Sequence, residues 1–264
     1  VQEEASRYAL LHGMIMATKD GNYAQHAPCT LVPSQISKES YERVRDTCTD
    51  INYLVHRMAS NPTFMTETLE VIAEADPDFM GRLLHIYQTV RAEGVRQPLA
   101  LGIFRSDYMD HRGEKFLQVE VNTIASGFGS LSTIVHQLHL HLVDYFGWEE
   151  YREYLCPDNA PLKKITEGLQ VAVQAFVERE KKSLAAAKIE GEPVIVFVVE
   201  ANERNAFDQF WLQMELWEKW RLRVVRLTMR EIEETTHLSV VGQHLCLEDG
   251  RPIALCYFRV GYDP

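Results

Sequence analysis

The sequence lacks the features that would indicate a membrane or an exported protein. No window has about 18 consecutive apolar residues, which excludes a transmembrane helix. The N-terminus has acidic residues at Glu3 and Glu4 and no basic region before an apolar core, so we expect no secretory signal. The five cysteines are odd in number, scattered and without a C-x-x-C pair. This usage favours reduced, mostly buried thiols, Cys156 among them, in a cytoplasmic protein. We expect no membrane partner.

Basic charge and several catalytic motifs are also scarce. The chain has 27 Lys and Arg against 38 Asp and Glu, a net charge of −11, which argues against nucleic-acid binding. A few convergent arginines can still bind a small anion. There is no Ser nucleophile elbow, no G-x-x-x-x-G-K-[ST] loop and no G-x-G-x-x-G fingerprint after a strand. The sequence therefore does not indicate a protein nucleophile.

What the sequence does contain is the periodicity of an α/β fold. Apolar spacing predicts a helical N-terminal layer of about 95 residues, followed by strands and further helices. The expected helices cover Ser40–Met58, Leu131–Phe146 and Leu162–Lys182, with others opening at Asn61-Pro62 and Asp76-Pro77, and strands are expected at Leu99–Phe104 and Phe116–Val121.

From Pro193 the pattern changes to short alternating elements, typical of a small three-layer α/β unit. The continuous apolar run Val194–Val199 predicts a strand buried on both faces. Further elements are expected at Phe207–Trp220, Arg223–Leu227, Met229–Glu234, Val240–Leu247 and Pro252–Phe258, with Asp249-Gly250 as a hairpin turn. The charged, Ala-rich stretch before Gly191 predicts a boundary between domains 1–189 and 190–264.

Glu120 and Asn122 are two residues apart on one strand, so their side chains leave the same face. A carboxylate and an amide oxygen suit a magnesium ion that also binds phosphate. The small residues that follow, Ala125 to Gly127, let the backbone approach an anion closely. The alternative is an edge strand with an exposed Glu and a turn-forming Asn.

Three further segments place polar groups after predicted strands. Arg105, after Leu99–Phe104, suits a substrate carboxylate, and its alternative is a local ion pair with Asp107 or Asp110. Arg259 also follows a predicted strand. Gly261 permits a tight turn there, and Tyr262 could lay its ring and hydroxyl over a ligand. The alternative is a frayed terminus.

Between these lies a polar segment before the Phe207–Trp220 helix. Asn205 is expected as the N-cap, with Asp208 completing an acidic capping box. Glu203 could receive an ammonium group, while Arg204 and Gln209 could reach a carboxylate or amide.

The run His136, His139 and His141 is not expected to bind a metal. His141 lies about 140° round a helix from His136, so three ligands could not converge without breaking the helix. We expect a polar or partly buried helix face instead.

Five ordered blocks resemble eukaryotic-type glutathione synthetase, an ATP-grasp ligase that joins γ-glutamylcysteine to glycine. The blocks are Tyr23–Pro33, Arg105–Met109, Gln118–Phe128, Glu203–Gln209 and Tyr257–Tyr262. The resemblance implies an N-terminal region with ATP-grasp-related strands, a small substrate-binding domain, and amide formation through an acyl phosphate. It also implies a cytoplasmic homodimer that uses ATP and Mg²⁺.

By this resemblance Glu120 and Asn122 would bind Mg²⁺, with Glu120 also at the ATP phosphates. The residues implied in γ-glutamylcysteine binding are Arg105, Ile124, Ala125, Ser126, Gly127, Glu203, Arg204, Asn205, Gln209, Arg259, Val260, Gly261 and Tyr262.

Two blocks depart from the family. The loop that commonly reads Ser-Ala-Ser is Ala125-Ser126-Gly127 here, and Val260 replaces an Asp. The chain also corresponds to roughly the N-terminal half of such a ligase, without its glycine-rich lid. We therefore expect a fragment that is inactive alone. Alternatives are a non-catalytic γ-glutamylcysteine-binding or regulatory module, and a homoglutathione-type synthetase that uses β-alanine or serine.

Overall fold

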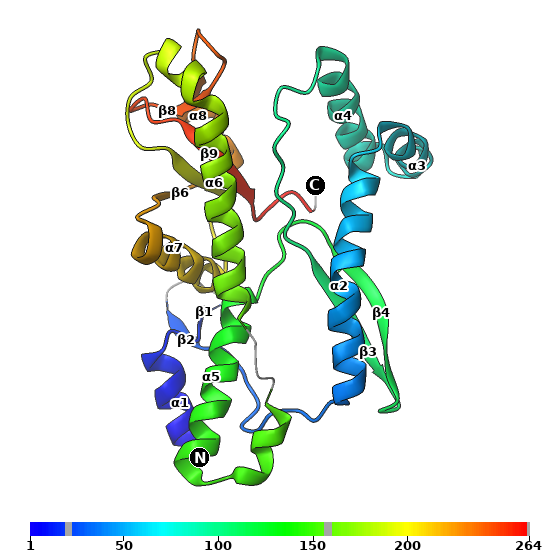
Figure 1. The fold of residues 1–264 in the computed structure, drawn as a ribbon, viewed down its shortest axis with the longest axis vertical. Helices are drawn as coiled ribbons and strands as arrows, with labels where there is room; N and C mark the ends of the chain where they lie inside the picture. The colour runs from blue at the N-terminus through cyan, green and yellow to red at the C-terminus, as the bar shows by residue number, and fades with distance from the viewer. Residues whose placement is uncertain (19–22, 156–159, 263–264) are drawn as a thin grey trace. The chain divides into compact units, whose positions relative to one another are not determined.

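The computed structural model describes residues 1–18, 23–155 and 160–262, so Cys156 lies outside the described residues. Figure 1 traces the chain from its N-terminus to its C-terminus. The chain divides into two compact units. The first unit comprises Val1–Gln35 and Ser126–Val260, and the second comprises Ile36–Ala125 and Gly261–Pro264. The boundary predicted between residues 189 and 190 falls inside the first unit, and the division into those domains stays a prediction.

The first unit is built on a three-stranded parallel sheet in the order β6–β5–β9. The strands are β5 (Val194–Val198), β6 (Val224–Leu227) and β9 (Ile253–Phe258). All five residues of β5 are buried, as the continuous apolar run predicted for a central strand. The carboxyl ends of parallel strands lie at one edge of the sheet. Glu203 follows the carboxyl end of β5 in the chain, and Arg259 follows the carboxyl end of β9.

Helices surround this sheet and extend beyond it. They are α1 (Gln2–Leu11), α5 (Gly129–Phe146), α6 (Pro161–Ala186), α7 (Ala206–Trp220) and α8 (Met229–Thr235), with a 3₁₀ helix at Glu149–Tyr154. In Figure 1, α6 runs beside the sheet, and it contacts α5, α7 and β9.

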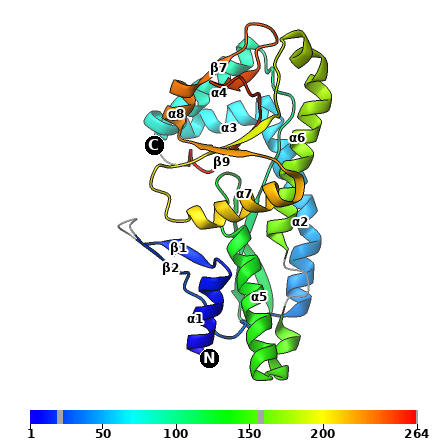
Figure 2. The same ribbon diagram turned by 90° about the vertical axis from the view of Figure 1, so that its left-hand side faces the viewer.

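Two antiparallel pairs complete the first unit: β1 (Ile15–Ala17) with β2 (Ala24–His26), and β7 (Thr236–Leu238) with β8 (Leu245–Leu247). Figure 2 shows the β1–β2 pair beside α1.

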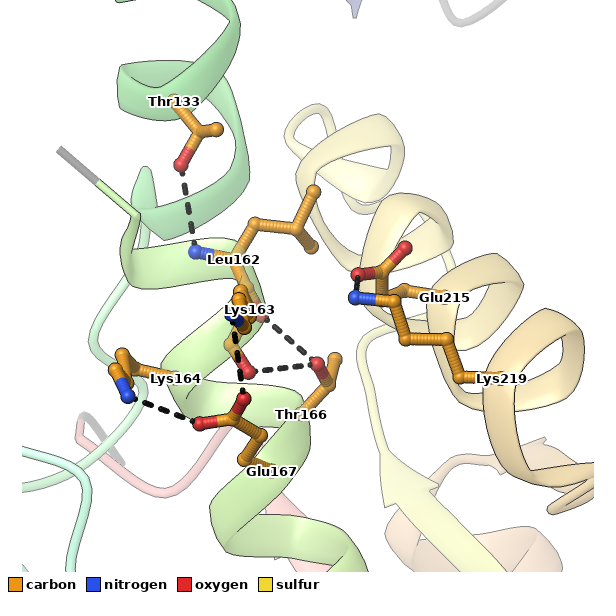
Figure 3. Close-up of polar contacts among 8 residues, drawn as sticks. All are labelled: Thr133, Leu162, Lys163, Lys164, Thr166, Glu167, Glu215 and Lys219. Atoms are coloured by element: carbon orange, nitrogen blue, oxygen red, sulfur yellow. Dashed lines mark hydrogen bonds and ion pairs between the residues drawn. The ribbon is translucent and has the colours of Figure 1, made fainter. Parts of the chain in front are cut away.

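The start of α6 is fastened to α5 by a side-chain hydrogen bond (Figure 3). The backbone N–H of Leu162 donates to the hydroxyl of Thr133 at 3.3 Å. One turn later the fully buried Thr166 hydroxyl donates to the Leu162 carbonyl at 3.0 Å. These contacts give hydrogen-bond partners to polar groups at the start of α6.

The N-terminus of α5 has no cap of its own. Phe128 is at the N-cap in a left-handed conformation, and its side chain accepts no capping hydrogen bond. The buried carboxylate of Asp208 on α7 supplies the missing acceptor. It receives the backbone N–H groups of Phe128 at 2.9 Å, Ser130 at 2.9 Å and Leu131 at 3.0 Å. The favourable interaction of an anion with a helix N-terminus therefore joins two helices far apart in sequence.

The second unit contains three helices and a β-hairpin. The helices are α2 (Lys38–Ala59), α3 (Pro62–Ala75) and α4 (Arg82–Glu93), with a π-helical turn at Pro77–Gly81 before α4. Antiparallel β3 (Arg105–His111) and β4 (Lys115–Asn122) follow, with a bulge after Asp107. Ser37 caps α2 and Asn61 caps α3 through their side chains, as Asn61-Pro62 predicted.

Several local predictions were wrong. Residues 99–104 form no strand, and Arg105 begins β3 instead of following a strand. Asp208 does not complete a capping box for α7, because its carboxylate is used by α5 and the side chain of Asn205 makes no capping bond. The chain does turn at Asp249-Gly250, where Leu247 N–H donates to the Arg251 carbonyl at 3.0 Å and an isolated bridge joins Cys246 to Pro252, but no hairpin of paired strands follows from it. The strands on either side pair elsewhere, β8 with β7 and β9 with β5.

Of the described cysteines only Cys246 is buried, while Cys29 and Cys256 are half-buried and Cys48 is exposed, so the prediction of mostly buried thiols was wrong. Cys29, Cys48, Cys246 and Cys256 are free thiols. Burial raises the pKa of the Cys29, Cys246 and Cys256 thiols, which keeps them in the unreactive neutral form. No helix in the described part of the chain is long and apolar enough to cross a membrane.

We predict that Asp208→Ala lowers the free energy of unfolding by about 2–4 kcal/mol, because three backbone N–H groups, two of them buried, lose their acceptor. Chemical denaturation measures this loss. Asp46→Ala is the matched control, since Asp46 is exposed on α2, and it should change stability by no more than about 0.5 kcal/mol. Equal losses in the two variants would contradict the capping role.

Candidate functional site

Arg259 is the most deeply buried cation of the first unit's predicted site, with 4% of its surface exposed. Its backbone N–H donates to the carbonyl of Val198, which anchors it beside the end of β5. Nη1 donates to the carbonyl of Ser126 and, at 3.2 Å, to the hydroxyl of Tyr257. Nε is buried and has no partner in the part of the chain that the structure describes. A buried guanidinium with an open N–H is suited to bind an anion.

Next to α7, Glu203 and Gln209 form a hydrogen-bonded chain. Oε1 of Glu203 accepts from the backbone N–H of Asn205 at 2.7 Å, and Oε2 accepts from Nε2 of Gln209 at 3.3 Å. Gln209 is completely buried, and its Oε1 accepts from Nη2 of Arg226 at 2.9 Å. The structure therefore unites two predicted residues with one that the sequence did not single out.

Arg226 was missed because it lies inside the predicted strand and not at its end. The available signal was a cation within the apolar sequence Val-Val-Arg-Leu. Its guanidinium lies 4.6 Å from the centre of the Phe210 ring. Burial lowers the pKa of Arg226, the charge of Glu203 raises it, and the charge of Arg259 lowers it. The positive charges of Arg226 and Arg259 are thus close enough to interact, and the carboxylate of Glu203 lies in the same cluster.

Gly127 and Asn205 complete the cluster. A Cβ atom at Gly127 would lie 3.2 Å from Nη2 of Arg259 and 3.2 Å from Nδ2 of Asn205, so a larger residue would press on both. Oδ1 of Asn205 is buried without a partner among the described residues. The cluster therefore offers open donors and an open acceptor, as needed by a ligand with carboxylate and ammonium groups.

In the second unit, Arg105 is engaged by Asp107. Nε and Nη2 of Arg105 donate to the two carboxylate oxygens at 2.8 and 3.0 Å. This is the ion-pair alternative raised by the sequence, and it lowers the pKa of Asp107. The role of Arg105 in substrate binding stays a prediction.

Glu120 and Asn122 lie together on β4, opposite β3. Nδ2 of Asn122 donates to Oε1 of Glu120 and to Oδ2 of Asp107, both at 3.1 Å. The donor set of two carboxylates and an amide oxygen fits Mg²⁺, which prefers oxygen ligands and retains several waters. Binding through the amide oxygen requires the Asn122 amide to turn over. Asp107 was not predicted here, although its position in the Arg105–Met109 block pointed to it.

The remaining predicted residues are placed as follows. Val260 packs in an apolar core cluster with Val198 and Ile253, so its side chain is not available to a ligand. The carbonyl of Arg204 accepts from the backbone N–H of Ala17 at 3.1 Å.

The other predicted positions belong to the second unit. Ala125 has a φ of 52° and Gly261 a φ of 95°. Ile124 lies next to Gly261, and Tyr262 is exposed.

The three histidines have separate surroundings. Nε2 of His139 lies 2.8 Å from the carbonyl of Thr30, and Nε2 of His141 lies 3.0 Å from the carboxylate of Glu4. Across the described ranges, no group of three or more His, Cys, Asp or Glu side chains is arranged to hold a metal ion.

Comparison with known proteins gives a consistent result. Residues 1–243 match the family model of the eukaryotic glutathione synthase, ATP binding domain. Similar proteins include glutathione synthetase of Dictyostelium discoideum, 30% identical over 279 residues that span 100% of this chain and 56% of that protein. The chloroplastic glutathione synthetase of Solanum lycopersicum is 35% identical over 245 residues, 90% of this chain and 41% of that protein. The human glutathione synthetase is 30% identical over 97% of this chain and 52% of its own length.

The fold also has a counterpart among solved structures. A glutathione synthetase-like effector from Globodera pallida, in its apo form, superposes with a TM-score of 0.74 at 22% identity. The match covers 98% of this chain and 56% of that one. The chain thus spans about half the length of the curated relatives it matches.

We predict that Asp107→Asn weakens the second unit only while Asp107 is ionised. The pKa of Asp107 is lowered in the folded state. The ion pair therefore stabilises the protein at pH values above the usual Asp pKa of about 3.9, and this stabilisation is lost as the pH falls through the lower pKa of the folded state. The stability difference from the parent should be about 0.5–1 kcal/mol at neutral pH, since the pair is partly exposed, and should vanish in acid. Denaturation over this pH range tests it, and a difference independent of pH would contradict the ion-pair origin.

Proposed function

The chain belongs to the eukaryotic glutathione synthase family, and on that premise we propose that it serves the ATP-dependent ligation of γ-glutamylcysteine to glycine. The observation that carries this proposal is the buried Arg259, whose open Nε lies in the same cluster as the Glu203–Gln209 chain. A dipeptide with an ammonium group and carboxylates matches this combination of one acidic and two basic side chains.

The proposal assigns dipeptide binding to the first unit. Glu203 accepts from the ammonium group, Arg259 donates to a carboxylate, and the small Gly127 leaves room for backbone contact. Val260 contributes through its backbone, because its side chain packs in the core. Binding of this kind positions the reacting carboxylate and holds it away from water.

The proposal assigns metal and phosphate binding to the second unit, where Glu120 and Asn122 would hold Mg²⁺ and Arg105 would contact substrate. Bound Mg²⁺ supplies neutralisation of charge on phosphate oxygens. In the reaction, the dipeptide carboxylate takes the γ-phosphoryl group of ATP and releases ADP. The glycine amine then displaces phosphate from the acyl phosphate and loses a proton to form the amide.

A second candidate is a γ-glutamylcysteine-binding module without ligation. It is favoured by Val260, whose side chain lies in the core where the family's Asp would be polar, and by Ala125 and Gly127, which remove hydroxyls from the loop. Incubation of the native protein isolated from its source, and not of the 264-residue chain alone, with ATP, Mg²⁺, γ-glutamylcysteine and glycine discriminates between the two. Release of ADP with tripeptide supports the ligase, and dipeptide binding without either product supports the module.

The acceptor and the assembly belong to the same proposal. Replacing glycine by β-alanine or serine in this assay tests a homoglutathione-type activity. Sedimentation of the purified chain tests the proposed homodimer, and fractionation of the source cells tests the cytoplasmic location.

We predict that Arg259→Ala weakens γ-glutamylcysteine binding by about 2–4 kcal/mol, because the bound carboxylate loses its charge-assisted partner. Isothermal titration calorimetry measures the change. Arg251→Ala is the matched control, since Arg251 pairs with Asp249 at an exposed turn. Unchanged affinity in the Arg259 variant would make that arginine structural only.

We also predict that Glu120→Gln abolishes the effect of Mg²⁺ on ATP binding while dipeptide affinity stays within a factor of about two. The neutral amide is a poor substitute for a carboxylate at a magnesium ion. Titration of ATP with and without Mg²⁺ measures this. Glu114→Gln, in the β3–β4 turn, serves as the control, and normal Mg²⁺ dependence in the Glu120→Gln variant would remove the metal assignment.

A further inference from the structure

Arg226 is a half-buried charged residue to which the dipeptide proposal assigns no contact with the ligand. We propose that Arg226 is a positioning residue for the dipeptide site, which fixes the orientation of Gln209 and, through it, of Glu203. This inference rests on the proposed function, because it concerns the same site.

Arg226 fixes the orientation of the Gln209 amide. An arginine side chain only donates hydrogen bonds, so the group facing Nη2 of Arg226 at 2.9 Å must be the amide oxygen. The amide nitrogen is then directed to Oε2 of Glu203 at 3.3 Å. A neutral apolar residue at position 226 would remove this constraint and allow Gln209 to turn over.

The orientation of Gln209 in turn affects the carboxylate of Glu203. Its two carboxylate oxygens have different donors, the backbone N–H of Asn205 for Oε1 and Gln209 for Oε2. A carboxylate held at both oxygens presents its remaining lone pairs in fixed directions, as recognition of an ammonium group requires. If Gln209 turned over, its carbonyl would face Glu203 and two acceptors would repel each other.

Arg226 is itself held in place by an aromatic ring. Its guanidinium lies over the Phe210 ring at 4.6 Å, one residue after Gln209 on α7. Burial and the charge of Arg259 both lower its pKa, so retaining a charge there is costly, and Glu203 offsets the cost. Nη1 of Arg226 is buried without a partner in the described part of the chain, so filling space in the sheet does not account for its donors. A purely packing role would be served by an apolar side chain.

The test measures γ-glutamylcysteine binding by calorimetry for the 264-residue chain and for variants, together with thermal unfolding without ligand. Arg226→Met should weaken binding at least about tenfold, the effect of losing one charge-assisted hydrogen bond in the cluster. Arg226→Lys keeps the charge but lacks the planar fork, and should recover only part of the affinity. If the Arg226→Met variant does not fold, the affinity of the Arg226→Lys variant still tests the inference. The matched control is Arg223→Met, because Arg223 is exposed and lies over the Trp217 ring.

A double-mutant cycle distinguishes positioning from an independent contribution. If Arg226 acts through Gln209, then adding Arg226→Met to Gln209→Met should cost little beyond the single Gln209 change. Fully additive losses, or an Arg226→Met variant that binds as tightly as the parent, would overturn the inference and leave the proposed function intact. A parent chain that binds no γ-glutamylcysteine would overturn both.

Discussion

The carboxylate of Asp208 joins α7 to the start of α5, and the site residues of the first unit depend on this junction. On one side of it lie Ser126 and Gly127, directly before the N–H groups that Asp208 receives. On the other side lies Gln209, the next residue along α7. Because three backbone donors converge on one buried acceptor, the loop and the helix cannot shift independently. The Ser126 carbonyl is thereby presented to Arg259, and Gln209 is presented to Arg226.

Around this junction the polar groups of the site are only partly satisfied. Nε of Arg259, Nη1 of Arg226 and Oδ1 of Asn205 are buried without partners among the described residues. Buried polar groups in folded proteins normally have partners, so a ligand with both acceptors and donors would complete the set. The two positive charges of the Arg226 and Arg259 guanidinium groups also outnumber the single negative charge of the Glu203 carboxylate. The cluster is thus preorganised for an anionic ligand that also carries an ammonium group, which is the chemistry proposed for it.

Sequence reasoning succeeded where periodicity reflects burial on a regular surface. The Val194–Val199 run became the buried β5, and Asn61-Pro62 marked the cap of α3. It failed at Leu99–Phe104, where an apolar sequence forms no strand, and at β3, whose polar sequence pairs with β4 alone and needs no buried face. Asp208 was misread because a capping box is a local pattern, whereas its actual partners, Phe128, Ser130 and Leu131, precede it by 80, 78 and 77 residues.

The sequence by itself determined the family and most of the helices, and it singled out Glu203, Gln209 and Arg259 as candidate site residues, because ordered motifs and local periodicity are visible along the chain. Only the tertiary structure decided which groups meet. Arg226 reaches Gln209 from another element, and Asp107 occupies the guanidinium of Arg105 before any substrate does. The physical reason is that a hydrogen bond or ion pair depends on the distance and direction between two groups in space. The separation of the two residues along the chain specifies neither quantity.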